Sequence, residues 1–209
     1  MSSLSIALLQ MIETELSSHR PSRPWLRRLM QRSAVAIILQ VQDGELHILM
    51  IKRAEREGDP WSGHMAFPGG RMDPGDAHGY AVALRETREE IGLDLERQAH
   101  CIGRLSDINA RPRVRSLGMA VSPFVFRMDR PAHCTINHEV AEVVWVPLEF
   151  LLNNANRKTM SWQRKRLKLK MPCYFYGERR IWGLSLAMLD ELMDLIEGSS
   201  SRRKSWNRR

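Results

Sequence analysis

The chain has 209 residues, of which 43% are hydrophobic and 27% charged, and its formal net charge is +8. This composition is ordinary for a globular protein, and the length suits one domain or one domain with extensions. No apolar run approaches the ~20 residues of a membrane span, so we expect no membrane partner. Three widely spaced cysteines without a Cys-x-x-Cys pair argue against a disulfide framework or a zinc site, and favour a cytoplasmic protein.

Hydrophobic periodicity and turn residues divide the chain into three parts. We expect an N-terminal helical extension at 1–32, a domain at 33–197, and a basic, disordered tail at 198–209. The elements expected in chain order are a helix over 3–17, strands over 34–41, 46–52 and 65–67, a helix starting near Ala77, strands near 99–106, 117–127 and 138–147, and helices over 148–153 and 184–196. A mixed sheet with one long helix and one C-terminal helix predicts an α/β sandwich.

The densest chemical pattern lies within residues 69–93, where three carboxylates occupy five positions. On a helix, Glu86, Glu89 and Glu90 stand at i, i+3 and i+4, on one face. Like charges at this spacing repel each other, and a hard divalent cation removes the repulsion. The pattern therefore predicts a site for Mg²⁺ or Mn²⁺.

The rest of this helix predicts how it is oriented. Tyr80, Leu84, Thr87 and Ile91 make one mostly apolar stripe, about 140° from the glutamates at ~100° per residue. We therefore expect the stripe to pack on the core and the glutamates to remain exposed. Asp76, among turn residues, is the expected N-cap.

This segment resembles the Nudix box of the Nudix hydrolases. That pattern consists of Gly, five residues, Glu, seven residues, and Arg-Glu-aliphatic-any-Glu-Glu-any-Gly-aliphatic. Gly70 and Asp76 take the first two places, with Asp replacing Glu. Eight residues rather than seven then precede Arg85, and Thr87 replaces an aliphatic residue.

The Phe-Pro-Gly-Gly run at 67–70 and the extra residue are similar to the coenzyme A pyrophosphatase-like branch of that family. The resemblance implies the Nudix fold, a mixed β-sheet sandwiched between helices. It also implies a metal-dependent pyrophosphohydrolase whose partner is a small-molecule nucleoside diphosphate derivative. Coenzyme A-like substrates are favoured, and the family also suggests a homodimer.

Roles for individual residues follow from the motif and from this resemblance. The expected metal ligands are Glu86, Glu89, Glu90 and the carbonyl of Gly70, since a Gly-Gly turn lets the backbone approach closely. The expected catalytic residues are Glu86, Glu89 and Arg85, the last pairing with a glutamate to orient it. The expected substrate-binding residues are Arg53, Gly69 and Gly70. The general base stays open among Glu89, Glu139 and Glu142.

Two alternatives remain at this point. Nucleotide sugars, ADP-ribose or dinucleoside polyphosphates are alternative substrates, and a Nudix-fold module that binds a nucleotide or RNA without cutting it is an alternative function. Basic runs at 157–170 and in the tail are compatible with nucleic acid, but such runs are more often solvated or disordered. The three intact glutamates count against a module that only binds.

Overall fold

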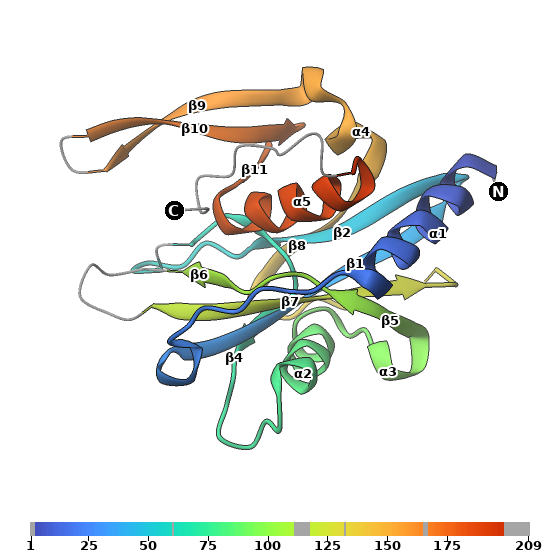
Figure 1. The fold of residues 1–209 in the computed structure, drawn as a ribbon. Helices are drawn as coiled ribbons and strands as arrows, with labels where there is room; N and C mark the ends of the chain where they lie inside the picture. Colours follow the sequence, from blue (N-terminus) through green and yellow to red (C-terminus); the bar gives the residue numbers. More distant parts are fainter. Residues whose placement is uncertain (1–2, 60, 111–117, 132, 165–166, 199–209) are drawn as a thin grey trace.

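A mixed β-sheet forms the centre of the molecule (Figure 1). The protein is described here from a computed structural model, which places residues 3–59, 61–110, 118–131, 133–164 and 167–198. The sheet strands in this part are β1 (Gln31–Gln42), β2 (Glu45–Arg53), β3 (Met65–Ala66), β4 (Gly69–Arg71), β5 (Ala99–Arg104), β6 (Ile108–Ala110), β7 (Met119–Met128) and β8 (Val140–Pro147).

The strand order is β3-β2-β1-β7-β5, while β4 pairs with β1, β6 with β7 and β8 with β2. Strands β1 and β7 run parallel, and the other pairs of this sheet run antiparallel. The turn between β1 and β2 uses Asp43 (φ 49°) and Gly44 (φ 86°), as a two-residue hairpin turn requires. The predicted hairpin is thus confirmed.

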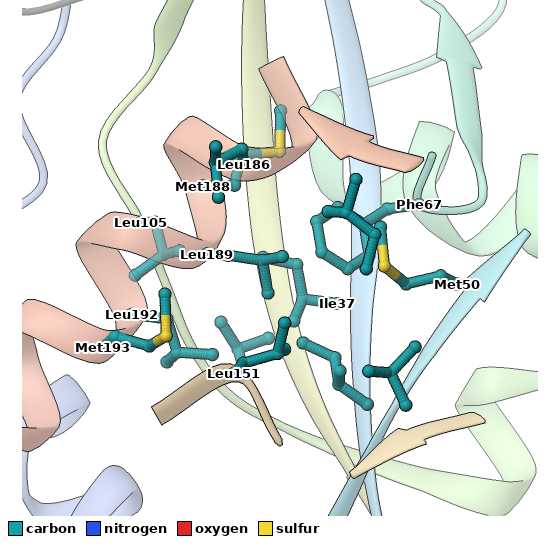
Figure 2. Packing of buried hydrophobic residues seen from close by; sticks show 14 of the residues in the cluster. Ile37, Met50, Phe67, Leu105, Leu151, Leu186, Met188, Leu189, Leu192 and Met193 are labelled. Atoms are coloured by element: carbon teal, nitrogen blue, oxygen red, sulfur yellow. The ribbon is translucent and has the colours of Figure 1, made fainter. Parts of the chain in front are cut away.

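Helices cover both faces of the sheet (Figure 1). One face carries α1 (Ser3–Ser18), α4 (Leu148–Leu152) and α5 (Gly183–Ile196), and the other carries α2 (Gly79–Ile91) and α3 (Leu95–Gln98). Because side chains alternate along a strand, Ile37 of β1 packs with the first group and Ile38 with the second. Figure 2 shows Leu189 of α5 beside Ile37. The predicted α/β sandwich is confirmed.

The N-terminal helix takes part in this core. Helix α1 matches the predicted helix over 3–17, and its Ile12 and Leu16 are 1% and 4% exposed. Both side chains belong to the same apolar cluster as α5. A short 3-10 turn, η1 (Arg27–Leu29), then leads into β1, where Arg27 Nε donates a 2.5 Å hydrogen bond to Asp107.

A second, three-stranded antiparallel sheet was not predicted. It consists of β9 (Arg157–Arg164), β10 (Leu167–Tyr176) and β11 (Arg179–Trp182), in the order β11-β10-β9, and follows a 3-10 turn, η2 (Asn154–Asn156). Tyr174 and Ile181 are fully buried in the α5 cluster, which fixes this sheet to the domain. Arg157 also pairs with Asp190 of α5 at 2.7 Å. The basic run at 157–170 is therefore largely strand.

Within the described ranges, no helix combines the length and the apolar character needed to cross a membrane. Residues 199–209 of the predicted basic tail lie outside these ranges. All three cysteines, Cys101, Cys134 and Cys173, are free thiols.

Candidate active site

Glu90 lies in the packed face of α2, where its exposed fraction is 2%. The buried positions of the helix are Val82, Ala83, Thr87, Glu90 and Ile91. Tyr80 and Leu84, expected at the centre of the buried stripe, are only partly buried. The prediction that the three glutamates share an exposed face is therefore wrong for Glu90, because the helix is rotated toward the sheet from its predicted orientation.

The start of α2 also differs from the prediction. The helix begins at Gly79, and its N-cap is His78, whose Nδ1 accepts a 3.2 Å hydrogen bond from the backbone N–H of Ala81. The expectation that Asp76 caps the helix is wrong, since the Asp76 carboxylate is bound to Arg85 instead.

The buried Glu90 carboxylate is held by strand β4. Its Oε2 accepts a 2.9 Å hydrogen bond from the backbone N–H of Gly69. Gly69 has φ 153°, and a Cβ at this position would stand 2.3 Å from the carbonyl oxygen of Ala34 on β1. Only glycine fits this conformation and this close approach, so any other residue at position 69 would displace the N–H that binds Glu90.

Gly70 leaves the space that Glu86 occupies. A Cβ at position 70 would lie 2.2 Å from Oε1 of Glu86 and 2.3 Å from its carboxyl carbon. The carbonyl of Gly70 accepts a 2.5 Å hydrogen bond from the hydroxyl of Ser33 on β1. The two glycines therefore bring the backbone of β4 against two glutamates that are one helical turn apart.

Arg85 joins the carboxylates around it into one network. Its Nη1 donates to Oε1 of Glu86 at 2.9 Å and to Oε2 of Glu89 at 3.1 Å. Its Nε and Nη2 both donate to Asp76, at 3.2 and 2.9 Å, and Nη2 also donates to the carbonyl of Arg71. Asp76 thus anchors Arg85 through both of its oxygens, and Arg85 in turn orients two glutamates.

The contact between Asp76 and Arg85 was not predicted from the sequence. A signal for it existed, because Asp76 occupies the place of the first glutamate in the Nudix box. The hydrogen bonds from Arg85 hold the pKa of Asp76 below its ordinary value, so the anchor stays ionised.

The two inner glutamates are harder to ionise than usual. Burial raises the pKa of Glu90 to about 7, with the charge of Glu86 adding to the shift and the Gly69 hydrogen bond opposing it. Burial also raises the pKa of Glu86, while Arg85 opposes this change. Two carboxylates that resist ionisation close together form a site that a cation would stabilise.

The three candidates for the general base have different surroundings. Glu142 on β8 is bound by both Nε and Nη2 of Arg179, and this pairing lowers the pKa of Glu142. Glu139 lies 3.3 Å from Arg56, and its charge contributes to the raised pKa values of Glu86 and Glu90. The side chain of Glu89 is 55% exposed.

Arg53 ends β2, and its positive charge opposes the rise of the Glu90 pKa. Its Nη2 donates a 2.9 Å hydrogen bond to Asp59. Its Nε is buried and has no hydrogen-bond partner among the described residues. The backbone N–H of Arg53 donates to the carbonyl of His64 at 3.0 Å.

The chemistry of these donors suits a hard cation. Carboxylate and carbonyl oxygens are the ligands that Mg²⁺ and Mn²⁺ prefer, and Glu86, Glu89, Glu90 and Gly70 supply both kinds. Across the described ranges, no three Asp, Glu, His or Cys side chains are arranged as a metal site. Glu86 and Glu89 accept hydrogen bonds from Arg85, and Glu90 accepts one from Gly69. The candidate ligands are therefore adjacent but engaged with protein partners.

Comparison with protein families gives a match to the NUDIX domain over residues 30–168. The mitochondrial coenzyme A diphosphatase NUDT8 of Homo sapiens is 30% identical over 174 residues, covering 82% of this chain and 72% of that protein. The protein of the same name from Mus musculus is 29% identical, covering 82% and 80%. Nudix hydrolase 3 of Caenorhabditis elegans is 30% identical, covering 78% and 72%.

Solved structures agree with the fold. A NUDIX hydrolase from Alicyclobacillus acidocaldarius superposes with a TM-score of 0.55 at 16% identity, covering 81% of this chain and 92% of that one. A MutT/nudix family protein from Enterococcus faecalis gives a TM-score of 0.50 at 16% identity, covering 93% and 71%. At this level of identity the likeness concerns the fold alone.

Proposed function

This chain belongs to the Nudix hydrolase family, and we propose that it is a divalent-metal-dependent pyrophosphohydrolase that cleaves coenzyme A-like nucleoside diphosphate derivatives. The observation that carries the proposal is the meeting of Glu86 and Glu90 with Gly69 and Gly70. Gly70 leaves the space that the Glu86 carboxylate occupies, and the N–H of Gly69 binds Glu90, so the backbone of β4 and the charges of α2 form one site.

The relatives support the substrate class. Two similar proteins are named coenzyme A diphosphatases, and the match to each covers 82% of this chain. Coenzyme A contains a diphosphate between an adenosine phosphate and a pantetheine arm. Hydrolysis adds water across the P–O–P linkage, so that the water oxygen bonds to one phosphorus and the bridging oxygen leaves with the other.

The residues of this chain would divide the work as follows. Glu86, Glu89, Glu90 and the Gly70 carbonyl would hold the cations, and Mg²⁺ or Mn²⁺ bound there would neutralise the diphosphate and align a water. Arg85, anchored by Asp76, orients Glu86 and Glu89. Arg53 would bind a substrate phosphate through its buried, unpartnered Nε, with Gly69 and Gly70 forming the floor of the site.

Glu89 and Glu139 are the better candidates for the general base. Glu142 is committed to Arg179, and its lowered pKa makes it a weak proton acceptor. Glu89 is exposed and hydrogen-bonded to Arg85, within the same network as Glu86. We favour Glu89, with Glu139 as the alternative.

A substrate panel tests the proposal directly. The purified full chain is incubated with coenzyme A, ADP-ribose, a nucleotide sugar and a dinucleoside polyphosphate, with Mg²⁺, Mn²⁺, Ca²⁺ or EDTA. We expect coenzyme A to give two phosphate monoesters with Mg²⁺ or Mn²⁺, little product with Ca²⁺, which prefers looser coordination, and none with EDTA. Hydrolysis unchanged by EDTA would overturn the metal dependence, and no hydrolysis of the whole panel would overturn the activity.

A pair of variants connects activity to the site. Glu86→Gln should reduce kcat by several powers of ten, because the change removes the negative charge of a carboxylate that would bind the cation. Glu142→Gln, on strand β8, is the matched control and should reduce kcat much less. Equal losses in the two variants would place Glu142 in the site.

The remaining properties are also proposals. Three free thiols are consistent with a reducing compartment, for which we favour the cytoplasm. We favour a homodimer by analogy with the family, which light scattering on the purified chain would test. We expect no nucleic-acid partner, unless the basic tail at 198–209 binds one.

A further inference from the structure

An aromatic and cationic cluster lies where the second sheet meets the first. Strand β11 contacts β3, the short strand that precedes the two glycines of the candidate active site. Trp182 of β11 contacts the ring of His64, which precedes β3, with centroids 5.2 Å apart, and the ring of Trp162 on β9, 5.9 Å away. The guanidinium of Arg180 lies 5.2 Å from the Trp182 ring.

Two residues that contact His64 carry a buried hydrogen-bond donor. The indole Nε1 of Trp182, whose ring contacts the His64 ring, is buried and has no partner among the described residues. Arg53, whose backbone N–H donates to the His64 carbonyl, has a buried Nε that is likewise without a described partner. Buried N–H groups without an acceptor destabilise a fold and are rare, so each is a candidate to receive an acceptor from a ligand.

The charges around the cluster favour an anionic ligand. Arg180 is exposed, and in the described ranges no carboxylate forms a salt bridge with it. Burial holds the pKa of His64 below its ordinary value, with the charges of Arg180 and Arg53 adding to the shift and that of Asp59 opposing it, so the ring is neutral at pH 7. A neutral imidazole can donate to or accept from a polar ring, and the two arginines can pair with phosphate.

We infer that Trp162, Trp182 and Arg180 form the site for the nucleoside half of the substrate, with the base on the tryptophans and a phosphate at Arg180. This inference rests on the proposed function, because it assigns one end of the same substrate. A nucleoside phosphate supplies each missing partner: a flat aromatic face, ring or sugar acceptors, and anionic oxygens. Arg53 connects the two parts of this site, because its backbone N–H binds the carbonyl of His64, beside Trp182, and its charge acts on Glu90.

The alternative is that the cluster only packs the second sheet on the first. Packing accounts for the ring contacts of Trp182 with His64 and Trp162. It leaves without an explanation the unpartnered Trp182 donor and the exposed Arg180, which lies over the Trp182 ring. A ligand accounts for all of these features together.

Equilibrium binding separates the two cases without relying on hydrolysis. The probes are the four nucleoside monophosphates and ribose 5-phosphate, titrated calorimetrically into the full chain. Wild type should bind at least one nucleoside monophosphate about five- to 150-fold more tightly than ribose 5-phosphate, which is the range for stacking of one base on an aromatic side chain. Wild type that binds none of the four more tightly than ribose 5-phosphate would overturn the inference.

Three variants locate the base. Trp162→Ala should remove most of this preference and leave ribose 5-phosphate affinity unchanged. Trp182→Phe keeps a ring for packing but lacks the N–H, so it should weaken nucleoside monophosphate binding severalfold. Trp25→Ala is the matched control, because Trp25 is 93% exposed and belongs to a different part of the chain. Unchanged preference in both Trp162→Ala and Trp182→Phe, with melting temperatures lowered, would show a packing role only.

Hydrolysis assays distinguish failure of this inference from failure of the proposed function. For an active enzyme, Trp162→Ala should raise KM and leave kcat within about twofold, because the base contacts are remote from the reacting phosphorus. A chain that binds a nucleoside monophosphate through Trp162 but cleaves nothing would refute the activity and keep the site. A chain that cleaves coenzyme A, with KM unaffected by Trp162→Ala, would keep the activity and refute the site.

Discussion

The backbone N–H of Gly69 donates a 2.9 Å hydrogen bond to Oε2 of Glu90, and this contact ties strand β4 to the buried face of helix α2. Glu90 is 2% exposed, so its carboxylate depends on this amide, on Arg53 nearby and on any bound cation for stabilisation of its charge. Burial of this carboxylate, which the Gly69 hydrogen bond only partly offsets, destabilises the metal-free protein when Glu90 is ionised.

The metal-free protein should therefore lose stability as pH rises toward 7. The folded-state pKa of Glu90, about 7, lies above its ordinary value of 4.5, so the folded state binds the proton more tightly than the unfolded state does. As pH rises from 4.5 to about 7, the free energy of unfolding should fall by on the order of 3 kcal/mol, and it should stay at this lower level at higher pH. Calorimetry in EDTA should show Glu90→Gln melting several degrees above wild type at pH 8 and close to it at pH 5.

Glu142→Gln gives the opposite sign and serves as the control. Arg179 lowers the pKa of Glu142, so this carboxylate stabilises the fold above its ordinary pKa and loses that effect as pH falls. The variant should melt below wild type at pH 8. A Glu90→Gln difference of the same size at pH 5 and pH 8 would mean that Glu90 does not titrate in this range.

Gly70→Ala should damage the site while sparing the fold. The new Cβ would stand 2.2 Å from Oε1 of Glu86, so the carboxylate must move away. Displacing a catalytic group by about 1 Å can cost roughly 10²-fold, and we expect a loss of this order in kcat/KM. Gly75→Ala is the matched control, since a Cβ there meets nothing within 4 Å. Similar kinetics for the two alanine variants would contradict the close packing of Glu86 on Gly70.

Arg85→Lys should weaken metal binding although it keeps the positive charge. The guanidinium of Arg85 binds Asp76 through two nitrogens and binds Glu86 and Glu89 through the third. A lysine side chain has a single nitrogen and cannot make all of these contacts at once. Losing such an orienting contact typically costs about 10- to 100-fold in metal affinity or activity. Titration with Mn²⁺ measures the change. Arg88→Lys, at an exposed position on the same helix, should bind Mn²⁺ like wild type.

Removal of residues 199–209 should leave the chemistry intact. Helix α5 ends at Ile196, and no residue assigned to the site follows it. We expect kcat on coenzyme A to change by less than about twofold. If the tail binds nucleic acid, truncation should instead reduce the salt dependence of that binding by roughly one unit of slope per lost phosphate contact. A truncated chain that binds Mn²⁺ normally but no longer cleaves the substrate would place the tail in the site.

Much of the fold could be predicted from local patterns. The helix over 3–17, the hairpin at Asp43-Gly44 and the helix over 184–196 have strong periodicity or turn residues, and each was found within one or two residues. The second sheet was missed although leucine and lysine alternate over 167–170, which is a strand pattern. The many lysines and arginines of 157–170 favoured the interpretation of this run as solvated or disordered.

The sequence by itself determined which residues could build the site, because the glutamates, Arg85 and the two glycines are recognisable from their types and spacing. Only the tertiary structure decided how they are used. Helical spacing places Glu90 on one face with Glu86 but does not say which way that face turns; the packing of Val82 and Ala83 on the sheet rotates Glu90 inward. Asp76 likewise binds Arg85 rather than capping the helix, since contacts between side chains distant in sequence depend on how the chain folds back on itself.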